Sequence, residues 1–247
     1  MDLAGKVVLV VGGAAGIGAA TSRLCAERGA SVIVADRDEA GGAGVAGGCG
    51  GAFIPVDVAD EASVKRMYAR VAQAPGRLDV LLHVAGVLKG AHVPLEEFTL
   101  ETFRMVLDVN TTGSFLCSKH AVPLMERSGG GVIVLVSSGA ATHGSSSFAY
   151  GTSKGGVNSL GVVLANALAP KNIRVNVVAP GNIDTGMKRS VIAAEVERGG
   201  GPADGRPAEL EKAVADAGLG SPDGVARVLA WLASDDAEYV RGIVTTR

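Results

Sequence analysis

Tyr150 and Lys154 stand four residues apart, a spacing that places both side chains on one face of a helix. A free tyrosine has a pKa of about 10, and a nearby ammonium favours the phenolate and lowers that value. Ser137 and Ser138 lie just upstream, at the end of an apolar run, where a hydroxyl can hydrogen-bond a substrate oxygen. Together these groups predict proton transfer to or from a carbonyl or an alcohol. The spacing by itself fits an ordinary surface helix better, so the prediction depends on the rest of the chain.

A glycine-rich turn follows the first apolar run, residues 6–11. Gly12, Gly16 and Gly18 precede a segment with a helical pattern that ends at Gly29. In this strand, turn and helix, glycines let the backbone approach a pyrophosphate, and the helix N-terminus offers N–H groups to it. The spacing differs from the common dinucleotide fingerprint Gly-x-Gly-x-x-Gly. Because the chain has 36 glycines, about twice the usual share, the cluster alone is weak evidence.

An acidic residue, Asp36, stands at the end of the second apolar run, residues 31–35, and 18 residues after Gly18. A carboxylate about 20 residues past the glycine turn is where the adenosine ribose binds. It accepts hydrogen bonds from the ribose hydroxyls and repels a 2′-phosphate, so it favours NAD over NADP. The adjacent Arg37 partly offsets that repulsion. The alternative is a turn residue that caps the next segment.

These motifs resemble those of the short-chain dehydrogenase/reductase family along essentially the whole chain. The glycine turn matches the family's Thr-Gly-x-x-x-Gly-x-Gly, with Val11 in place of threonine. The Asn-Asn-Ala-Gly motif is matched only in its last two positions, since His83 and Val84 replace its two asparagines. A histidine can still donate one hydrogen bond, so we expect altered local packing and no loss of binding. The residues at positions that bind the cofactor in the family are Gly12, Gly16, Ile17, Gly18, Asp36, Arg37, Asp57, Val58, Ala85, Gly86, Tyr150, Lys154, Pro180, Gly181, Ile183 and Thr185.

The resemblance implies hydride exchange between NAD(H) and a secondary alcohol or ketone. Tyr150 would move the proton, Lys154 would lower its pKa and hold the nicotinamide ribose, and Ser138 would orient the substrate oxygen. Asn110 would position a water that links Lys154 to solvent. The register of the preceding strand favours Ser138, whereas the family's usual spacing of 13 before Tyr150 points to Ser137, which stays the alternative.

Two other functions stay open. An NADPH-dependent 3-oxoacyl-thioester or carbonyl reductase of the same fold is disfavoured by Asp36. A non-catalytic dinucleotide-binding sensor or scaffold is favoured by the altered motif at His83. It is disfavoured by the complete catalytic set, because a scaffold has no need of a depressed phenol pKa. The sequence does not identify the alcohol or ketone.

The composition of the chain limits the classes of partner that we expect it to bind. A net charge of −2, no basic run and 4% aromatic residues argue against nucleic acid. No apolar stretch approaches the 18 residues that span a bilayer, and the start of the chain lacks a basic signal-peptide region. Three scattered cysteines and four dispersed histidines predict neither disulfides nor a metal site. We therefore expect a cytoplasmic protein that acts on a small molecule.

Strand-like and helix-like segments alternate, which predicts one doubly wound, Rossmann-like α/β domain over residues 1–247, with a mostly seven-stranded parallel sheet. The glycine-dense segment 41–51 predicts a short or frayed helix. The expected strands are residues 6–11, 31–35, 52–56, 78–84, 131–137, 173–178 and 242–245.

Residues 188–220 are rich in glycine, proline and charge and follow the predicted nicotinamide site. By resemblance to the family they form a mobile lid over the substrate, with a disordered surface insertion as the alternative. Helices near residues 112–127 and 151–168 correspond to the family's subunit contacts. Their small residues predict a homotetramer, with a dimer as the alternative.

Overall fold

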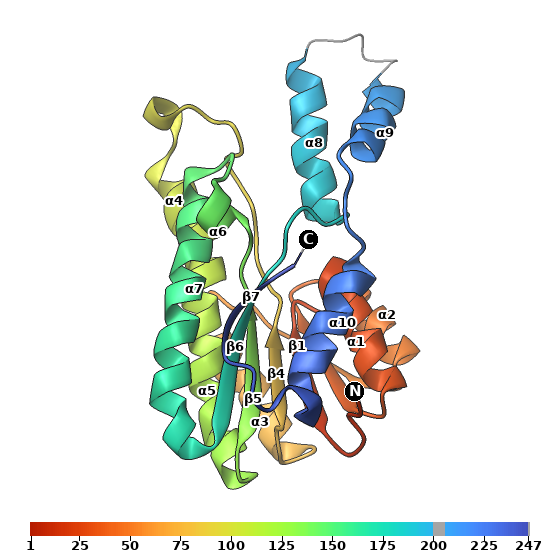
Figure 1. The fold of residues 1–247 in the computed structure, drawn as a ribbon, viewed down its shortest axis with the longest axis vertical. Coiled ribbons are helices and arrows are strands. Elements are labelled where there is room, and N and C mark those ends of the chain that lie inside the picture. The colour runs from red at the N-terminus through yellow and green to blue at the C-terminus, as the bar shows by residue number, and fades with distance from the viewer. Residues whose placement is uncertain (200–205, 247) are drawn as a thin grey trace.

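The computed structural model describes residues 1–199 and 206–246. Within them, seven parallel strands form one sheet in the order β3-β2-β1-β4-β5-β6-β7 (Figure 1). The predicted fold class is therefore confirmed. Each strand lies within two residues of its expected bounds at either end. The strands are β1 (Val7–Val11), β2 (Ser31–Asp36), β3 (Ala52–Pro55), β4 (Val80–His83), β5 (Gly131–Val136), β6 (Ile173–Ala179) and β7 (Gly242–Thr245).

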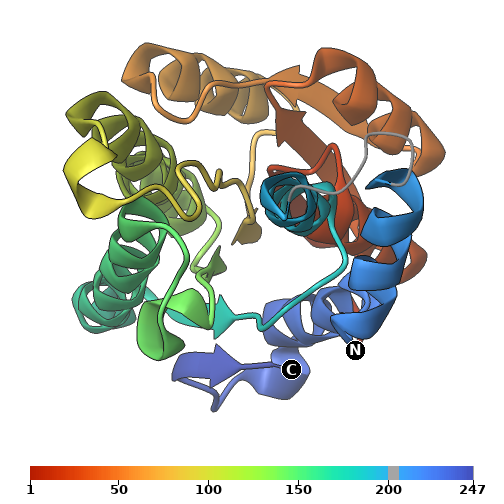
Figure 2. The ribbon, with the colours of Figure 1, turned by 90° about the horizontal axis from the view of Figure 1, so that it is seen from above.

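Helices connect the strands and surround the sheet (Figure 2). The α-helices are α1 (Gly16–Glu27), α2 (Glu39–Gly48), α3 (Glu61–Gln73), α4 (Leu100–Leu107), α5 (Gly113–Arg127), α6 (Ala140–His143), α7 (Phe148–Leu168), α8 (Gly186–Arg198), α9 (Arg206–Asp216) and α10 (Pro222–Ala233). Shorter turns are η1 (Leu95–Glu97), the π-helical η2 (Asp108–Thr112), η3 (Ala169–Lys171) and η4 (Asp235–Ala237).

The β-branched runs are buried on both faces of the sheet, as a parallel sheet covered by helices requires. Successive side chains of a strand point to opposite faces. In β1, Leu9 and Val11 therefore join the core beneath α3, α5 and α7, whereas Val8 and Val10 join the core beneath α1, α2 and α10. This alternation fixes which side of the sheet each helix covers.

Helix α2 is more regular than its sequence predicts. It runs for ten residues despite five glycines, whereas we expected a short or frayed helix. The Asp38 side chain caps its N-terminus by accepting a hydrogen bond from the Gly41 N–H at 3.0 Å. A Cβ at Gly42 would overlap the ring of Phe53 on β3, so this glycine permits close packing of the helix on the sheet.

The sheet reverses its strand order between β1 and β4, and in such sheets ligands bind where the carboxyl ends of the strands diverge at this point. Helices α8 and α9 stand above those ends (Figures 1 and 2). The segment predicted as a lid or a surface insertion thus contains two helices, and its middle, residues 200–205, lies outside the described residues. No helix in the described part of the chain is both long and apolar enough to cross a membrane.

Candidate active site

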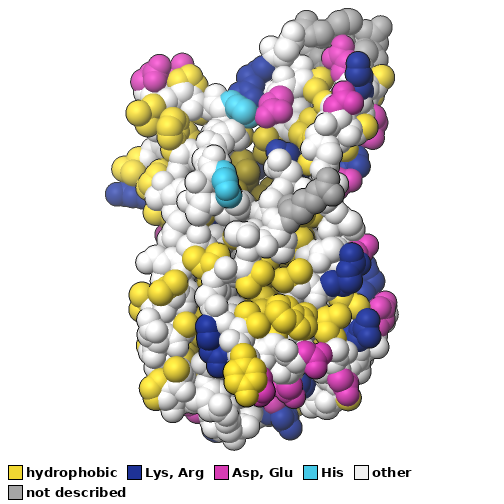
Figure 3. Space-filling view, viewed as in Figure 1, with side chains coloured by type: hydrophobic (Ala, Val, Ile, Leu, Met, Phe, Trp, Pro, Cys, Tyr) yellow, Lys and Arg dark blue, Asp and Glu magenta, His cyan; other side chains and the backbone are white. Residues whose placement is uncertain are grey.

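A cavity of about 670 Å³ opens at the carboxyl ends of the strands. All of the predicted cofactor-binding residues line it, together with Ser138, Tyr150 and Lys154 from the predicted catalytic set. Figure 3 shows the surface hollowed below α8, with hydrophobic side chains in the hollow. Segments that are far apart in the sequence, from Val11 to Val191, thus meet at one site.

The glycine turn is shaped as a cradle. Gly12 has a φ of 84°, and a Cβ there would overlap the backbone of Ala85 in the loop after β4. A Cβ at Gly18 would overlap the Gly12 carbonyl oxygen, so the turn and the start of α1 pack with no room for a side chain. The N-cap residue of α1, Ala15, offers no side-chain cap, which leaves the first N–H groups of the helix directed at the cavity. This arrangement fits a pyrophosphate.

The Asp36 carboxylate is held in place by two backbone N–H groups. Its Oδ2 accepts from the Ala14 N–H at 3.0 Å, and its Oδ1 accepts from the Asp38 N–H at 3.0 Å. Each oxygen retains a lone pair, so the carboxylate can still accept bonds from a pair of ribose hydroxyls. Asp57, which follows β3, also lines the cavity, and its Oδ1 accepts from the Ala59 N–H at 2.9 Å.

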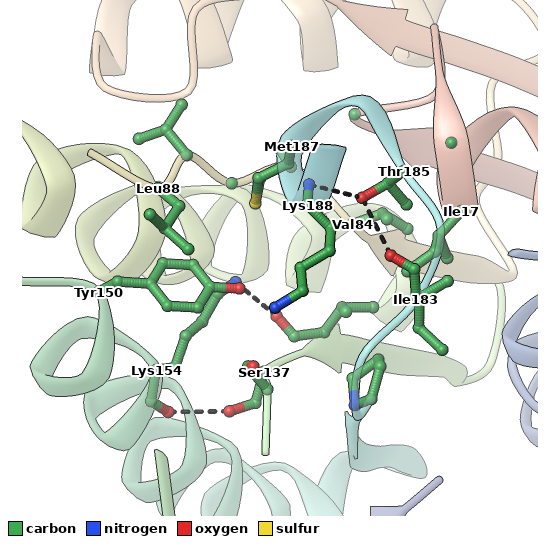
Figure 4. A pocket seen from close by; sticks show the side chains of 18 of the residues that line it. Ile17, Val84, Leu88, Ser137, Tyr150, Lys154, Ile183, Thr185, Met187 and Lys188 are labelled. Atoms are coloured by element: carbon green, nitrogen blue, oxygen red, sulfur yellow. Dashed lines mark hydrogen bonds between the residues drawn. The ribbon is translucent and has the colours of Figure 1, made fainter. Parts of the chain in front are cut away.

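Tyr150 and Lys154 lie in the first two turns of α7, where Ser147 caps the helix by accepting from the Tyr150 N–H at 3.2 Å. The Lys154 Nζ donates to the Val136 carbonyl oxygen at 2.9 Å and lies 5.7 Å from the centre of the Tyr150 ring (Figure 4). The lysine is only 3% exposed, and its removal from water lowers its pKa to about 8.

The pKa of Tyr150 differs from our expectation. We expected Lys154 to lower it, but burial of the phenol raises it, and a hydrogen bond with Ser138 offsets only part of that rise. Burial is the larger effect, and the hydrogen bond of the Lys154 ammonium goes to the Val136 carbonyl and not to the phenol. The phenol of the described structure therefore carries its proton at neutral pH.

The two candidate serines differ in orientation. The Ser137 hydroxyl is buried and donates to the Lys154 backbone carbonyl at 2.9 Å, so it ties β5 to α7. The Ser138 hydroxyl hydrogen-bonds the Tyr150 side chain inside the cavity. The geometry thus favours Ser138, the residue that the strand register selects.

Asn110 does not line the cavity but lies behind it, fully buried in the π-helical turn η2. Its Oδ1 accepts from the Val87 N–H at 2.8 Å, and its Nδ2 donates to the Val87 carbonyl at 2.9 Å and to the Ser153 Oγ at 2.9 Å. Single-turn π-bulges inside α-helices are frequently found at functional sites. Here the turn lets one amide hold the cavity-lining loop after β4 against α7; its predicted water contact stays a prediction.

His83 behaves differently from the expected donor. It is fully buried at the end of β4, and neither ring nitrogen has a hydrogen-bond partner among the described residues. Burial, with the charge of Lys154 adding to it, lowers its pKa to about 3. The imidazole is therefore neutral throughout the physiological range.

Sequence reasoning missed several residues that line the substrate end of the cavity. It pointed to loops near residues 88–95, 139–149 and 182–220 but named no side chains there. The structure places Leu88, His143, Met187, Lys188 and Val191 on the wall. The only available signal was the position of Met187 and Lys188 directly after the predicted nicotinamide motif.

One histidine links three of these segments. The His92 Nε2 lies 2.7 Å from the Glu195 Oε1 on α8, and the backbone N–H of His92 donates to the Ser146 carbonyl at 2.6 Å. The Arg198 guanidinium also reaches the His92 carbonyl, at 3.4 Å. The loop after β4, the loop before α7 and helix α8 thus meet above the cavity.

A family model described as enoyl-(acyl carrier protein) reductase matches residues 12–246. The chain belongs to the short-chain dehydrogenase/reductase family. A member of this family from Sinomonas cyclohexanicum, cis-4-hydroxycyclohexanecarboxylate dehydrogenase, is 39% identical over 97% of this chain and 93% of its own length. The 3-oxoacyl-[acyl-carrier-protein] reductase of Thermotoga maritima is 36% identical over 99% of this chain and 96% of its own.

A solved structure supports the same family assignment. A short-chain type dehydrogenase/reductase from Mycobacterium ulcerans superposes with a TM-score of 0.83 and 31% identity, covering 99% of this chain and 89% of that one. Enzymes of this family are oxidoreductases that bind a nicotinamide dinucleotide and act on CH–OH groups. The glycine cradle of the cavity fits the pyrophosphate of such a dinucleotide. Among the described residues, no group of three histidine, cysteine or acidic side chains is placed to hold a metal ion.

Proposed function

We propose that this short-chain dehydrogenase/reductase uses NAD(H) to interconvert a secondary alcohol and a ketone, with Tyr150 as the general acid and base. The observation that carries the proposal is the convergence of Tyr150, Lys154 and Ser138 on the cavity that the glycine cradle and Asp36 also line. A nucleotide site and a proton-transfer site thus share one space.

Each residue has a defined task in the proposed reaction. The Ser138 hydroxyl binds the substrate oxygen, and the Tyr150 oxygen donates its proton to a ketone or accepts one from an alcohol. Burial raises the pKa of Tyr150, which suits donation of its proton to a ketone, and the Lys154 ammonium stands 5.7 Å from the ring centre, where its charge can stabilise the phenolate once the proton has left. When bound, NAD supplies the hydride acceptor and a positively charged ring. Asn110 keeps the Val87 loop in register with α7.

Asp36 supports NAD as the cofactor. Its carboxylate is held by the Ala14 N–H of the glycine turn and by the Asp38 N–H, which keeps its negative charge where a 2′-phosphate would approach. The second candidate function, an NADPH-dependent 3-oxoacyl-thioester reductase, is favoured by the similarity to the Thermotoga maritima reductase and by Arg37, which also lines the cavity. A sensor or scaffold is the third candidate, and His83 favours it because it departs from the family motif.

The experiment is a panel of secondary alcohols assayed with NAD and with NADP by absorbance of the reduced nicotinamide. Because the Sinomonas relative is named for a ring alcohol, alicyclic alcohols come first. Oxidation with NAD at a kcat/KM well above that with NADP is the expected result. A strong NADP preference with 3-oxoacyl thioesters as the best substrates would select the second candidate. Dinucleotide binding without any turnover would select the third.

Assembly and location are also proposals. Exposed apolar side chains on α5 and α7, Phe115 at 46%, Val162 at 47% and Val163 at 60%, support a homotetramer built on these helices, with a dimer as the alternative. The free thiols of Cys25 and Cys117 are buried, which suits a reducing, cytoplasmic compartment. Sedimentation equilibrium measures the assembly state directly.

A further inference from the structure

Lys188 reaches into the cavity from the first turn of α8. The Thr185 hydroxyl accepts a hydrogen bond from the Lys188 backbone N–H at 3.3 Å and so caps the start of the helix. The Lys188 side chain is half-buried and lines the cavity. Figure 4 shows this side chain directed toward Tyr150 and away from Ile17 of the glycine turn. The ammonium therefore faces the proton-transfer end of the cavity.

Lys188 and the next residue differ in how their charges are matched. The Arg189 guanidinium is held by Asp184 at 2.6 and 2.9 Å and by Glu211 at 3.5 Å. No carboxylate of residues 1–199 or 206–246 lies within ion-pair distance of the Lys188 ammonium. One of two consecutive cations is thus neutralised by the protein, while the other faces the cavity.

The carboxylates that line the cavity lie at its other end. Asp36 ends β2 and Asp57 follows β3. These two strands form the edge of the sheet that is farther from Tyr150. Near Tyr150 the titratable lining groups are Lys154, Lys188 and His143, and the remaining wall includes the apolar Leu88 and Met187. The substrate end therefore carries positive charge, is lined by no carboxylate among the described residues and is apolar over part of its wall, an environment that favours an anion with a hydrocarbon body.

We propose that Lys188 binds the carboxylate of the substrate, which makes the substrate class a hydroxy acid or its oxo acid. This inference rests on the proposed alcohol dehydrogenase function and adds the group that selects among alcohols. A carboxylate here gains a charge-assisted hydrogen bond in a partly desolvated site, which is worth about 10- to 100-fold in binding. The same ammonium also has the chemistry to bind a cofactor phosphate, so the experiment must separate the two anions.

The binding experiment uses benzoate and its neutral isostere benzamide with the NADH-saturated enzyme, measured by calorimetry. The wild-type protein is expected to bind benzoate at least 10-fold more tightly than benzamide. Lys188→Met removes this preference, Lys188→Arg retains it, and Lys212→Met, a matched change at an exposed lysine of α9, leaves it intact. NADH affinity is expected to stay within 2-fold in all four proteins.

Three results overturn the inference. One is equal affinity of the wild-type protein for benzoate and benzamide. Another is a Lys188→Met protein that keeps the preference but binds NADH at least 10-fold more weakly, which assigns the ammonium to the cofactor. The third is the absence of any NADH binding, which also removes the proposed function. A benzoate preference that depends on Lys188, in a protein that oxidises no alcohol, would leave the anion site standing and remove only the proposed dehydrogenase.

Discussion

The Ser137 hydroxyl donates a hydrogen bond to the Lys154 backbone carbonyl at 2.9 Å and so joins the end of β5 to the second turn of α7. Its neighbour Ser138 faces the opposite way and hydrogen-bonds Tyr150. A one-residue step along the chain thus separates a structural hydroxyl from one that faces the site, as the alternation of side chains at a strand end requires.

Changing each serine to alanine is expected to affect kcat and the free energy of unfolding differently. Ser138→Ala should lower kcat by about 10²- to 10³-fold with little change in stability, because it removes a donor to the substrate oxygen. Ser137→Ala should lower the free energy of unfolding by about 1 kcal/mol through the lost hydrogen bond and should lower kcat much less. Steady-state kinetics and urea unfolding of both variants measure this. A larger kcat loss in Ser137→Ala would reverse the assignment.

Lys154 is predicted to trade stability for function. Burial lowers its pKa from 10.5 to about 8, which amounts to a cost of about 3 kcal/mol for holding the ammonium in the folded state below pH 8. Lys154→Met should therefore raise the free energy of unfolding at pH 7 while it lowers turnover by at least about 100-fold.

The sign of the pH dependence follows from linkage. Between pH 8 and 10.5 the unfolded chain binds more protons than the folded one, so the wild-type protein gains stability as the pH rises and the advantage of Lys154→Met shrinks. Denaturant unfolding at pH 7, 9 and 10 follows this difference. A variant less stable than the wild-type protein at pH 7 would show that the ammonium is not a net cost.

His83 is predicted to limit stability in acid. Its pKa falls from 6.5 to about 3 on folding, so below pH 6.5 the unfolded state binds a proton that the folded state excludes. The protein should lose about 1.4 kcal/mol for each pH unit below 6.5, down to about pH 3, in addition to losses from other groups. His83→Asn, which restores the family's residue, should remove this slope. Parallel acid-unfolding slopes in the two proteins would contradict it.

Asp36 is predicted to set the cofactor preference by its charge alone. Asp36→Asn keeps an oxygen that can accept from the Ala14 N–H, so the glycine turn should stay in place, but it removes the repulsion of a 2′-phosphate. The ratio of kcat/KM for NADP to that for NAD should rise by about 100-fold. Arg37→Gln serves as the opposite change and should lower the ratio. An unchanged ratio in Asp36→Asn would assign the preference to other residues.

The sequence predicts the scaffold better than the details of the site. Short β-branched runs bounded by glycine admit few alternatives to a buried parallel strand, and the fixed motifs bring all the predicted cofactor residues to one cavity. The pKa of Tyr150 and the isolation of the His83 ring depend on burial and on the direction of neighbouring groups, which spacing does not encode. Lys188 faces the cavity because of how α8 is oriented above the sheet, and that orientation depends on distant contacts such as the one between His92 and Glu195.

The most direct test of the central claim is the rate of NAD-dependent alcohol oxidation by Tyr150→Phe, measured beside its affinity for NADH. The phenyl ring keeps the shape of the site and removes only the proton-carrying oxygen. We predict that kcat falls by about 10²- to 10⁴-fold while the NADH dissociation constant stays within a few-fold of the wild-type value. A Tyr150→Phe protein that oxidises the best alcohol at the wild-type rate would contradict the account.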